Sequence, residues 1–83
     1  MRVHVKLFAI LREHAGQSEV VLDLRPGATI ADASVALSEK FPDLQRYLPR
    51  VAFALNESYV KSDATLSDGD ELAFIPPVSG GFE

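Results

Sequence analysis

The residue pattern in this chain that is best suited to take part in a reaction is a glycine pair, Gly80-Gly81, that follows two prolines. Pro76 and Pro77 favour a stiff, extended backbone. Glycines have no β-carbon, so they can enter a narrow channel and adopt backbone angles closed to other residues. At ~3.3 Å per residue, residues 76–81 reach about 20 Å. This spacing predicts a tail that inserts into another protein's active site. The alternative is a frayed terminus, which most small domains have.

The rest of the sequence offers little catalytic chemistry. The chain contains no cysteine, which excludes disulfides, thiolate zinc sites and cysteine nucleophiles. Any sulfur handled here must therefore be carried on something other than a side-chain thiol. His4 and His14 have no serine partner in the pattern and are expected to face solvent. Asp68, Asp70 and Glu71 cluster, but the cluster is foremost a turn and lacks the spaced ligands of a calcium loop. We predict no metal site and no stand-alone enzyme.

Length, composition and charge favour one small domain. The chain has 83 residues, of which 47% are hydrophobic, and a domain of this size has one modest core. The net charge of −4 disfavours nucleic-acid binding, which depends on basic contacts to phosphate. No apolar run approaches the ~20 residues that span a bilayer, and the alternating residues 1–6 do not resemble a secretory signal. We expect a cytoplasmic protein that binds neither nucleic acid nor membrane.

Hydrophobic periodicity predicts the first two strands and the main helix. A period of two marks strands at residues 2–7 and 19–24, expected to pair as an antiparallel hairpin with a long loop over residues 10–17. In that loop, Arg12 and Glu13 are expected to form a surface ion pair or a loop contact. Thr29 is a good N-cap for a helix with Asp32 three residues later, and Pro42 should stop this helix.

Three further strands are predicted in the second half. Residues 51–55 alternate as a third strand, residues 59–60 form a very short one, and residues 71–75 form the last, with Leu72 and Phe74 inward. We therefore predict an α+β fold, the β-grasp or ubiquitin-like arrangement, with a mixed four- to five-stranded sheet packed on one main helix. Residues 1–77 would be this domain, and residues 78–83 a flexible tail that carries the glycine pair.

Three segments of the sequence resemble the small subunit of molybdopterin synthase, the MoaD family. They are the stretch from Leu7 to Gly16, the strand from Val51 to Asn56, and the block from Leu66 to Gly81. The last block is the most specific. The resemblance covers nearly the whole chain and implies a ubiquitin-like sulfur carrier in molybdenum cofactor biosynthesis.

The resemblance implies a reaction cycle on the tail. Gly81 would carry first an adenylate and then a thiocarboxylate, with Gly80 as its slender neighbour. The implied partners are a ubiquitin-activator-like adenylating enzyme (MoeB-like), a sulfur donor protein and the large synthase subunit (MoaE-like). ATP would be used by the activating enzyme, and no cofactor would be permanently bound. The large subunit would receive the tail and transfer its sulfur to a cyclic pyranopterin precursor.

One feature departs from the family pattern: Phe82 and Glu83 follow the glycine pair. With them attached, Gly81 has a peptide carbonyl and no carboxylate to adenylate, and a phenylalanine side chain should clash in a channel sized for glycine. We predict that both residues are removed before activation. The alternatives are a cloning artefact or an unprocessed paralogue.

A docking surface is predicted at the base of the tail. Phe8 and Ile75 are out of phase with the inward residues of their strands and could form an exposed apolar patch for both partner enzymes. The alternative is that they pack against the chain's own loops. The residues between Ile75 and the glycine pair, Pro76, Pro77, Val78 and Ser79, would extend this contact into the partner.

Two rival functions remain open at the level of sequence. A sulfur carrier for thiazole synthesis or tRNA thiolation would share the fold and the tail, although the residues from Pro76 to Gly81 favour the molybdopterin branch. A non-catalytic β-grasp adaptor would bind a partner without tail chemistry, and the Phe82-Glu83 extension is the best support for that reading.

Overall fold

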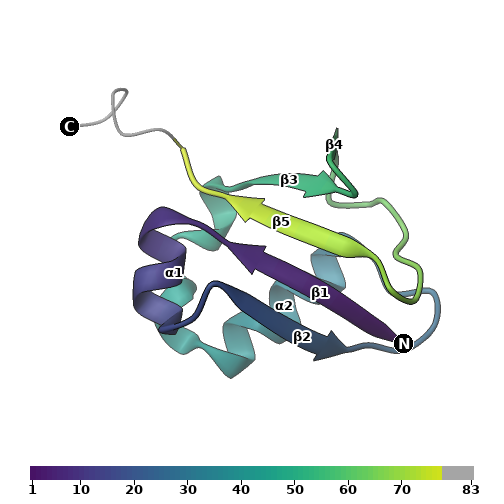
Figure 1. Ribbon diagram of the computed structural model, residues 1–83, viewed down its shortest axis with the longest axis horizontal. Helices are drawn as coiled ribbons and strands as arrows, with labels where there is room; N and C mark the ends of the chain where they lie inside the picture. Colours follow the sequence, from purple (N-terminus) through teal and green to yellow (C-terminus); the bar gives the residue numbers. More distant parts are fainter. Residues whose placement is uncertain (78–83) are drawn as a thin grey trace.

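The computed structural model describes residues 1–77, and residues 78–83 lie outside the described part. Strands and helices of residues 1–77 are arranged as shown in Figure 1. They are β1 (Arg2–Leu7), α1 (Ala9–Ala15), β2 (Glu19–Asp23), α2 (Ile30–Lys40), β3 (Ala52–Leu55), β4 (Ser58–Val60) and β5 (Glu71–Ile75). Two short 3₁₀ helices, η1 (Pro42–Leu44) and η2 (Leu48–Arg50), connect α2 to β3.

The strands form one mixed sheet in the order β2-β1-β5-β3-β4. β1 and β5, the first and last strands, lie side by side and run parallel, with His4 opposite Glu71 and Leu7 opposite Phe74. The other neighbouring pairs are antiparallel. Helix α2 lies behind the sheet in Figure 1, so the residues of β1 and β5 that do not face α2 form an outer surface. This arrangement confirms the predicted β-grasp fold.

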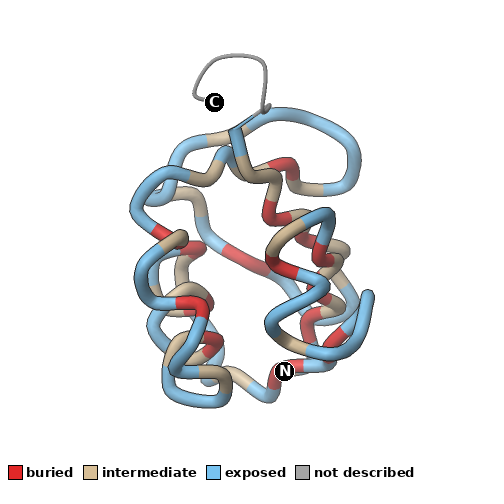
Figure 2. Tube along the Cα trace, turned by 90° about the vertical axis from the view of Figure 1, so that its left-hand side faces the viewer, coloured by how far each residue is buried: buried red, intermediate tan, exposed pale blue. Residues whose placement is uncertain are grey.

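The core lies between α2 and the inner face of the sheet. Alternate residues of three strands are buried there: Val3, Val5, Leu7, Val20, Leu22, Leu72 and Phe74. Helix α2 contributes Ile30, Ala33 and Leu37, which are all fully buried. Figure 2 shows these buried stretches in red along both layers. Burying one such side chain contributes about 1.5–3 kcal/mol, and a slip of one residue would turn a strand's whole apolar set toward solvent.

The start and stop signals of α2 are confirmed. Thr29 Oγ1 accepts a hydrogen bond from the Asp32 backbone N–H at 3.3 Å, and Asp32 Oδ2 accepts one from the Thr29 N–H at 2.9 Å. This capping box satisfies two N–H groups that have no partner inside the helix. The helix ends at Lys40, because Phe41 lies outside the helical region (φ −131°, ψ 83°) ahead of Pro42.

The prediction of a long loop between the first two strands is wrong, although their antiparallel pairing is confirmed. Residues 9–15 form the helix α1, which Leu11 anchors in the core with no exposed surface. Gly16 ends this helix in the left-handed region (φ 79°), and its N–H donates to the Arg12 carbonyl at 2.9 Å. A helix of two turns with one buried residue is too short to show a clear period of 3.6 in the sequence.

The strand boundaries differ from the prediction by one residue at most. β2 ends at Asp23, and β3 begins at Ala52 because the Val51 N–H donates to Leu48 in η2 at 3.3 Å. β4 covers Ser58–Val60 and is joined to β3 by two residues with positive φ, Asn56 (49°) and Glu57 (72°). Positive φ at both central residues is typical of the two-residue turns that match the twist of a hairpin.

The acidic cluster near β5 has a structural role in the described part of the chain. Asp68 Oδ1 accepts from the Arg2 N–H at 2.7 Å, and Asp70 Oδ2 accepts from the Ser67 N–H at 2.7 Å. Asn56 donates to Asp70 at 3.0 Å and accepts from the Glu71 N–H at 3.0 Å. Within residues 1–77, no group of three or more histidine, cysteine or acidic residues is placed to hold a metal ion. No helix in this range is long and apolar enough to cross a membrane.

Candidate functional site

The strand β5 brings the chain to the predicted site. It lies in the sheet between β1 and β3, and it ends at Ile75. Phe74 anchors its end, because the ring is fully buried and meets the Phe53 ring edge-on at 5.3 Å between centroids. Pro76 and Pro77 follow and have no N–H to extend the ladder. Val78, Ser79, Gly80, Gly81, Phe82 and Glu83, on which the tail predictions depend, lie outside the described residues.

The structure places Phe8 and Ile75 at the same end of the sheet. β1 and β5 are parallel and pair Leu7 with Phe74, so the next residues, Phe8 and Ile75, lie at the same end of the sheet. Phe8 is extended (φ −126°, ψ 153°) with 43% of its surface exposed, and Ile75 is half-buried. Because Leu7 and Phe74 face the core, their neighbours face the outer surface. The docking role of these two residues stays a prediction.

Four residues that the sequence did not single out extend this apolar surface. The register of β3 and β5 sets Ala52 opposite Ile75 and Ala54 opposite Ala73, on the outer side of the sheet. β4 adds Tyr59 opposite Ala54, with 74% of its surface exposed. We call this set the outer patch; it consists of Phe8, Ala52, Ala54, Tyr59, Ala73 and Ile75, of which Ala54 is itself buried. The period-two alternation places these residues outward, but only the strand order shows that they are neighbours.

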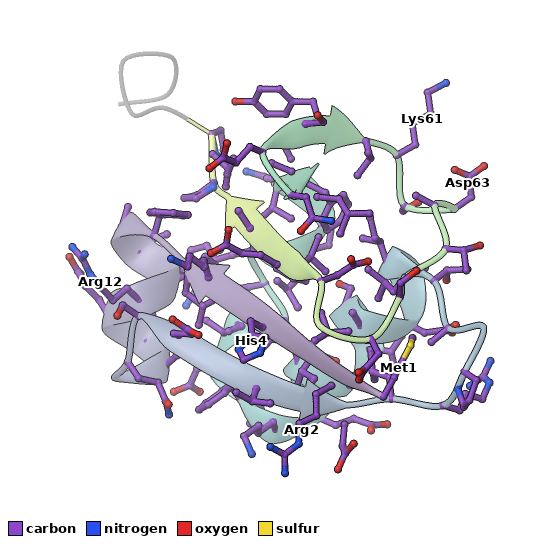
Figure 3. The ribbon with its side chains drawn as sticks, turned by 45° about the vertical axis from the view of Figure 1, so that its right-hand side comes forward. Met1, Arg2, His4, Arg12, Lys61 and Asp63 are labelled. Carbon is purple, nitrogen blue, oxygen red and sulfur yellow. The ribbon has the colours of Figure 1, made fainter. Side chains whose placement is uncertain are left out.

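A charged zone on β1, β2 and β5 borders the outer patch. Lys6 Nζ lies 3.0 Å from Glu71 Oε2, and His4 Nδ1 lies 3.3 Å from Glu19 Oε2. Figure 3 shows His4 on this outer side of the sheet. The hydrogen bond and charge of Glu71 raise the pKa of Lys6 above its ordinary value. All four side chains are nearly half exposed, so water and salt weaken these pairs. These charges can fix the orientation in which a partner docks on this face, which an apolar surface alone would not do.

Three other residues weighed from the sequence, Arg12, Glu13 and His14, belong to α1 rather than to a loop. His14 Nε2 lies 3.2 Å from the Tyr47 hydroxyl, and the two rings are 5.2 Å apart, so His14 has a partner that the sequence did not reveal. Arg12 and Glu13 are exposed on the same helix, and Figure 3 shows Arg12 directed away from the sheet. The ion pairs found within residues 1–77 do not join these two residues.

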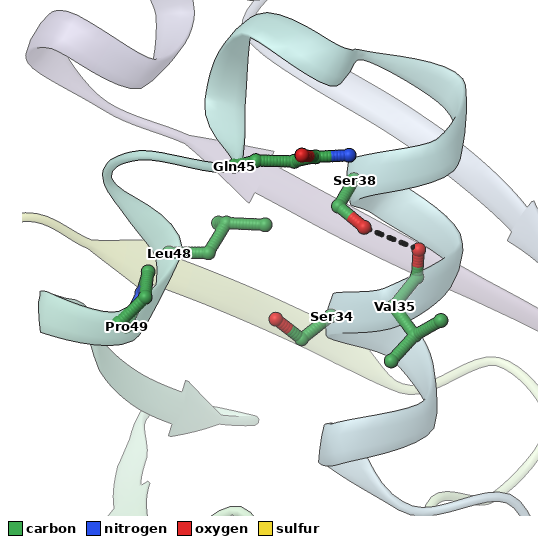
Figure 4. A pocket seen from close by; sticks show the side chains of 6 residues that line it. All are labelled: Ser34, Val35, Ser38, Gln45, Leu48 and Pro49. Carbon is green, nitrogen blue, oxygen red and sulfur yellow. Dashed lines mark hydrogen bonds between the residues drawn. The ribbon is translucent and has the colours of Figure 1, made fainter.

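A shallow hollow on the helical layer offers no chemistry of its own. It has a volume of about 250 Å³ and lies between α2 and η2 (Figure 4), and it is lined by Ser34, Val35, Ser38, Gln45, Leu48 and Pro49. The Ser38 hydroxyl already donates to the Val35 carbonyl at 2.8 Å. Because none of the lining side chains is an acid or a base, the hollow cannot move a proton during a reaction.

The fold and the site together define the class of this protein. A mixed five-stranded sheet on one main helix, with a glycine pair beyond its central last strand, makes it a ubiquitin-like β-grasp protein. The match to the ThiS family covers residues 5–81, which is most of the chain. The chain therefore belongs to the ThiS family.

Named relatives and solved structures agree with this assignment. The molybdopterin synthase sulfur carrier subunit of Chlamydomonas reinhardtii is 40% identical over 83 aligned positions, which cover 98% of this chain and 100% of the relative. The crystal structure of SAMP1 from Haloferax volcanii matches with a TM-score of 0.89 and 35% identity, over 98% of this chain and 100% of that one. A complex of subunits 1 and 2 of the molybdopterin-converting factor from Helicobacter pylori contains a chain with a TM-score of 0.73 and 27% identity, over 98% and 100% of the two chains.

Proposed function

We propose that this chain is the sulfur-carrier small subunit of a molybdopterin synthase, which delivers sulfur from Gly81 to a cyclic pyranopterin precursor. The observation that carries the proposal is the 40% identity, over the whole length of the relative, to a molybdopterin synthase sulfur carrier subunit. The family match ends at Gly81, so it includes the glycine pair and leaves out Phe82 and Glu83.

The proposed cycle begins with a free carboxylate on Gly81. A carboxylate is a poor electrophile, so a ubiquitin-activator-like adenylating enzyme joins it to AMP and releases pyrophosphate from ATP. Sulfur from a donor protein then replaces AMP at the carbonyl carbon and leaves a thiocarboxylate. This chemistry requires no thiol from the carrier, in agreement with a sequence that contains no cysteine.

The large synthase subunit completes the proposed cycle. Its active site receives the tail, and the thiocarboxylate sulfur forms a bond to a carbon of the precursor as an oxygen substituent leaves that carbon. Water then cleaves the acyl group from the sulfur, which returns Gly81 to a carboxylate for another round. Two rounds supply the two sulfurs of a dithiolene. We propose that the large subunit supplies the bases and cations of this step.

The outer patch is the proposed contact with the large subunit and with the adenylating enzyme. It lies at the end of the sheet where β5 releases the chain toward the tail, so docking there would aim the glycine pair into the partner. Phe8 and Ile75 supply the apolar area, and the Lys6–Glu71 pair at its border would set the orientation. In the Helicobacter pylori complex named above, a related chain is paired with a second subunit.

Activation requires that Phe82 and Glu83 be removed, because they hold the Gly81 carbonyl in a peptide bond. The proposed order is therefore proteolysis, adenylation and thiolation, all in the cytoplasm. Transfer of sulfur from a chain that still carries Phe82 would contradict the processing step.

The alternatives differ in what the tail delivers. A carrier for thiazole synthesis or tRNA thiolation would form the same thiocarboxylate and pass it to a different acceptor. A β-grasp adaptor would form none, so its partner would bind equally well after truncation behind Val78.

The deciding experiment compares a chain that ends at Gly81 with one that ends at Val78, each supplied with ATP, an adenylating enzyme, a sulfur donor and the large subunit. We expect the first to gain the mass of one sulfur-for-oxygen exchange and to yield molybdopterin from the precursor. The second should do neither. Thiocarboxylate formation without molybdopterin would favour the thiazole or tRNA branch, and failure of both steps in the first chain would refute the carrier function.

A further inference from the structure

The strand β2 forms one edge of the sheet, and its outer edge has no partner strand within residues 1–77. Met1 and Leu24 exchange two backbone hydrogen bonds, of 2.6 and 2.8 Å, just beyond the β1–β2 ladder. In an antiparallel ladder, bonded pairs alternate with non-bonded pairs. Counting from Met1–Leu24 along the register, the bonded pairs include Val20 and Leu22 of β2.

The intervening residues of β2 must therefore turn their backbone groups away from β1. Glu19, Val21 and Asp23 pair with Lys6, His4 and Arg2 in the non-bonded positions, so their N–H and C=O groups point to the free edge. Beyond the strand ladders, no backbone–backbone hydrogen bond within the described part of the chain uses these groups. An edge of this kind is a template for an added strand. The opposite edge, β4, is only three residues long and offers a shorter template.

A hollow lies beside this edge, between the end of β2 and the helix α2. Its volume is about 320 Å³. The residues that line it include the apolar Leu24, Ala28, Val35 and Ala36 and the charged Asp23, Arg25, Asp32 and Glu39, of which Arg25 and Asp32 pair at 3.5 Å. Val35 has 57% of its surface exposed in the middle of α2, and a β-branched residue there is a weak helix former. The hollow thus offers an apolar side chain together with an excess of acidic groups.

The charges of β2 argue against a second copy of this chain as the added strand. If two copies paired antiparallel about Val21, Glu19 of each would face Asp23 of the other. Like charges directly opposite each other destabilise a strand pair. Asp23 has 85% of its side chain exposed, and Glu19 has 47%, so both carboxylates are accessible to a strand of opposite charge.

We propose that the free edge of β2 and the hollow beside it bind an extended, basic segment of a partner protein, which adds to the sheet as a further strand. Side chains of the added strand alternate between the two faces of the sheet. On the outer face, an apolar residue would oppose Val21, and a lysine or arginine on each side would oppose Glu19 and Asp23. The residues between them would point toward α2, so an apolar side chain would enter the hollow near Val35.

The proposed edge site is separate from the outer patch. The hollow adjoins Asp23 and Leu24, at the end of β2 that lies near the N-terminus in Figure 1. β5 releases the chain toward the tail at the opposite end of the sheet. A partner bound at the edge site would therefore leave the end of β5 uncovered, and the two sites can be tested independently.

The test uses a short blocked peptide in which leucine-valine-leucine is flanked by arginines, titrated into the isotope-labelled full chain at about 0.15 M salt. We expect NMR shifts that centre on β2 and α2, and at least tenfold slower exchange of the Glu19, Val21 and Asp23 amides in the complex. A peptide with glutamates in place of the arginines should not bind. Shifts centred elsewhere, or equal binding of both peptides, would overturn the proposal.

Variants of β2 separate backbone pairing from charge. Val21→Pro removes the central outward N–H and leaves the β1–β2 bonds intact, since proline is tolerated at a sheet edge on the solvent side; it should weaken binding at least tenfold. Asp23→Lys should weaken it roughly two- to thirtyfold, because an opposite-charge pair becomes a like-charge pair. Asp63→Lys, remote from β2, is the matched control. Unchanged binding by Asp23→Lys would refute the charge pattern.

Two controls keep the test decisive. If Val21→Pro unfolds, the peptide is instead N-methylated at alternate residues, so that it cannot donate to the edge; retained affinity would exclude strand addition. Sedimentation of the free chain tests the competing occupant. A dimer that Asp23→Lys strengthens would assign the edge to a second copy and overturn the proposal.

Discussion

Replacing Ile75 by aspartate tests the proposed docking of the outer patch. Ile75 is half-buried at the end of β5, opposite Ala52, so the change leaves the core side chains of that strand in place. Burying an isoleucine side chain in an interface contributes about 1.5–3 kcal/mol, and a carboxylate buried without a partner opposes binding further. The sum predicts at least a hundredfold loss of affinity for the large synthase subunit.

The effect on the fold should be much smaller. Aspartate is disfavoured in strands by up to ~1 kcal/mol, which lowers Tm by about 4–8 °C in a domain of this size. Calorimetry with the large subunit, together with thermal unfolding of the carrier, separates the two effects. Ala31→Asp places the same charge on the exposed surface of α2 and should leave affinity unchanged. If Ile75→Asp stays folded and binds within threefold of the parent chain, the patch is not the docking surface.

Three further predictions concern stability. Leu11→Ala removes the only buried anchor of α1 and should cost about 2–5 kcal/mol of unfolding free energy in urea; a loss below 1 kcal/mol would show that α1 contributes little to the core. Thr29→Ala deletes the side-chain cap of α2 and should cost ~1 kcal/mol, whereas Thr29→Ser should retain most of it; equal losses would exclude the cap as the cause. The backbone hydrogen bond from Thr29 holds the pKa of Asp32 below its ordinary value, so this carboxylate stabilises the fold at neutral pH, and the contribution disappears as pH falls through the folded-state pKa. Asp32→Asn should therefore be less stable than the parent chain at pH 7, and the difference should shrink as pH falls through the folded-state pKa of Asp32; a difference that does not change with pH would contradict the linkage.

Much of the fold could be predicted from local patterns because each depends on residues close in sequence. The alternation in β1 and β5, the Thr29–Asp32 capping box and the stop at Pro42 are short-range signals. The helix α1 was not predicted, because it lacks such a short-range signal. Its only buried residue is Leu11, and one anchor does not make a periodic pattern.

The candidate sites also differ in whether their residues are contiguous in the sequence or are brought together by the fold. The tail chemistry depends on Pro76, Pro77 and the glycine pair, which are contiguous, so sequence alone could indicate it. The outer patch joins residues of β3, β4 and β5 with Phe8, and the edge site joins β2 with α2. No local pattern states which strands are neighbours, and the partner of His14 is Tyr47, far along the chain.

The sequence by itself determined which residues face inward, where the main helix begins and ends, and what chemistry the tail can carry. These properties follow from side-chain polarity, backbone preference and the absence of cysteine. Only the tertiary structure decided that β5 inserts between β1 and β3, which brings Phe8 beside Ile75 and leaves the edge of β2 free. The physical reason is that strand order minimises the exposed apolar surface of the whole sheet at once, so it depends on all the strands together.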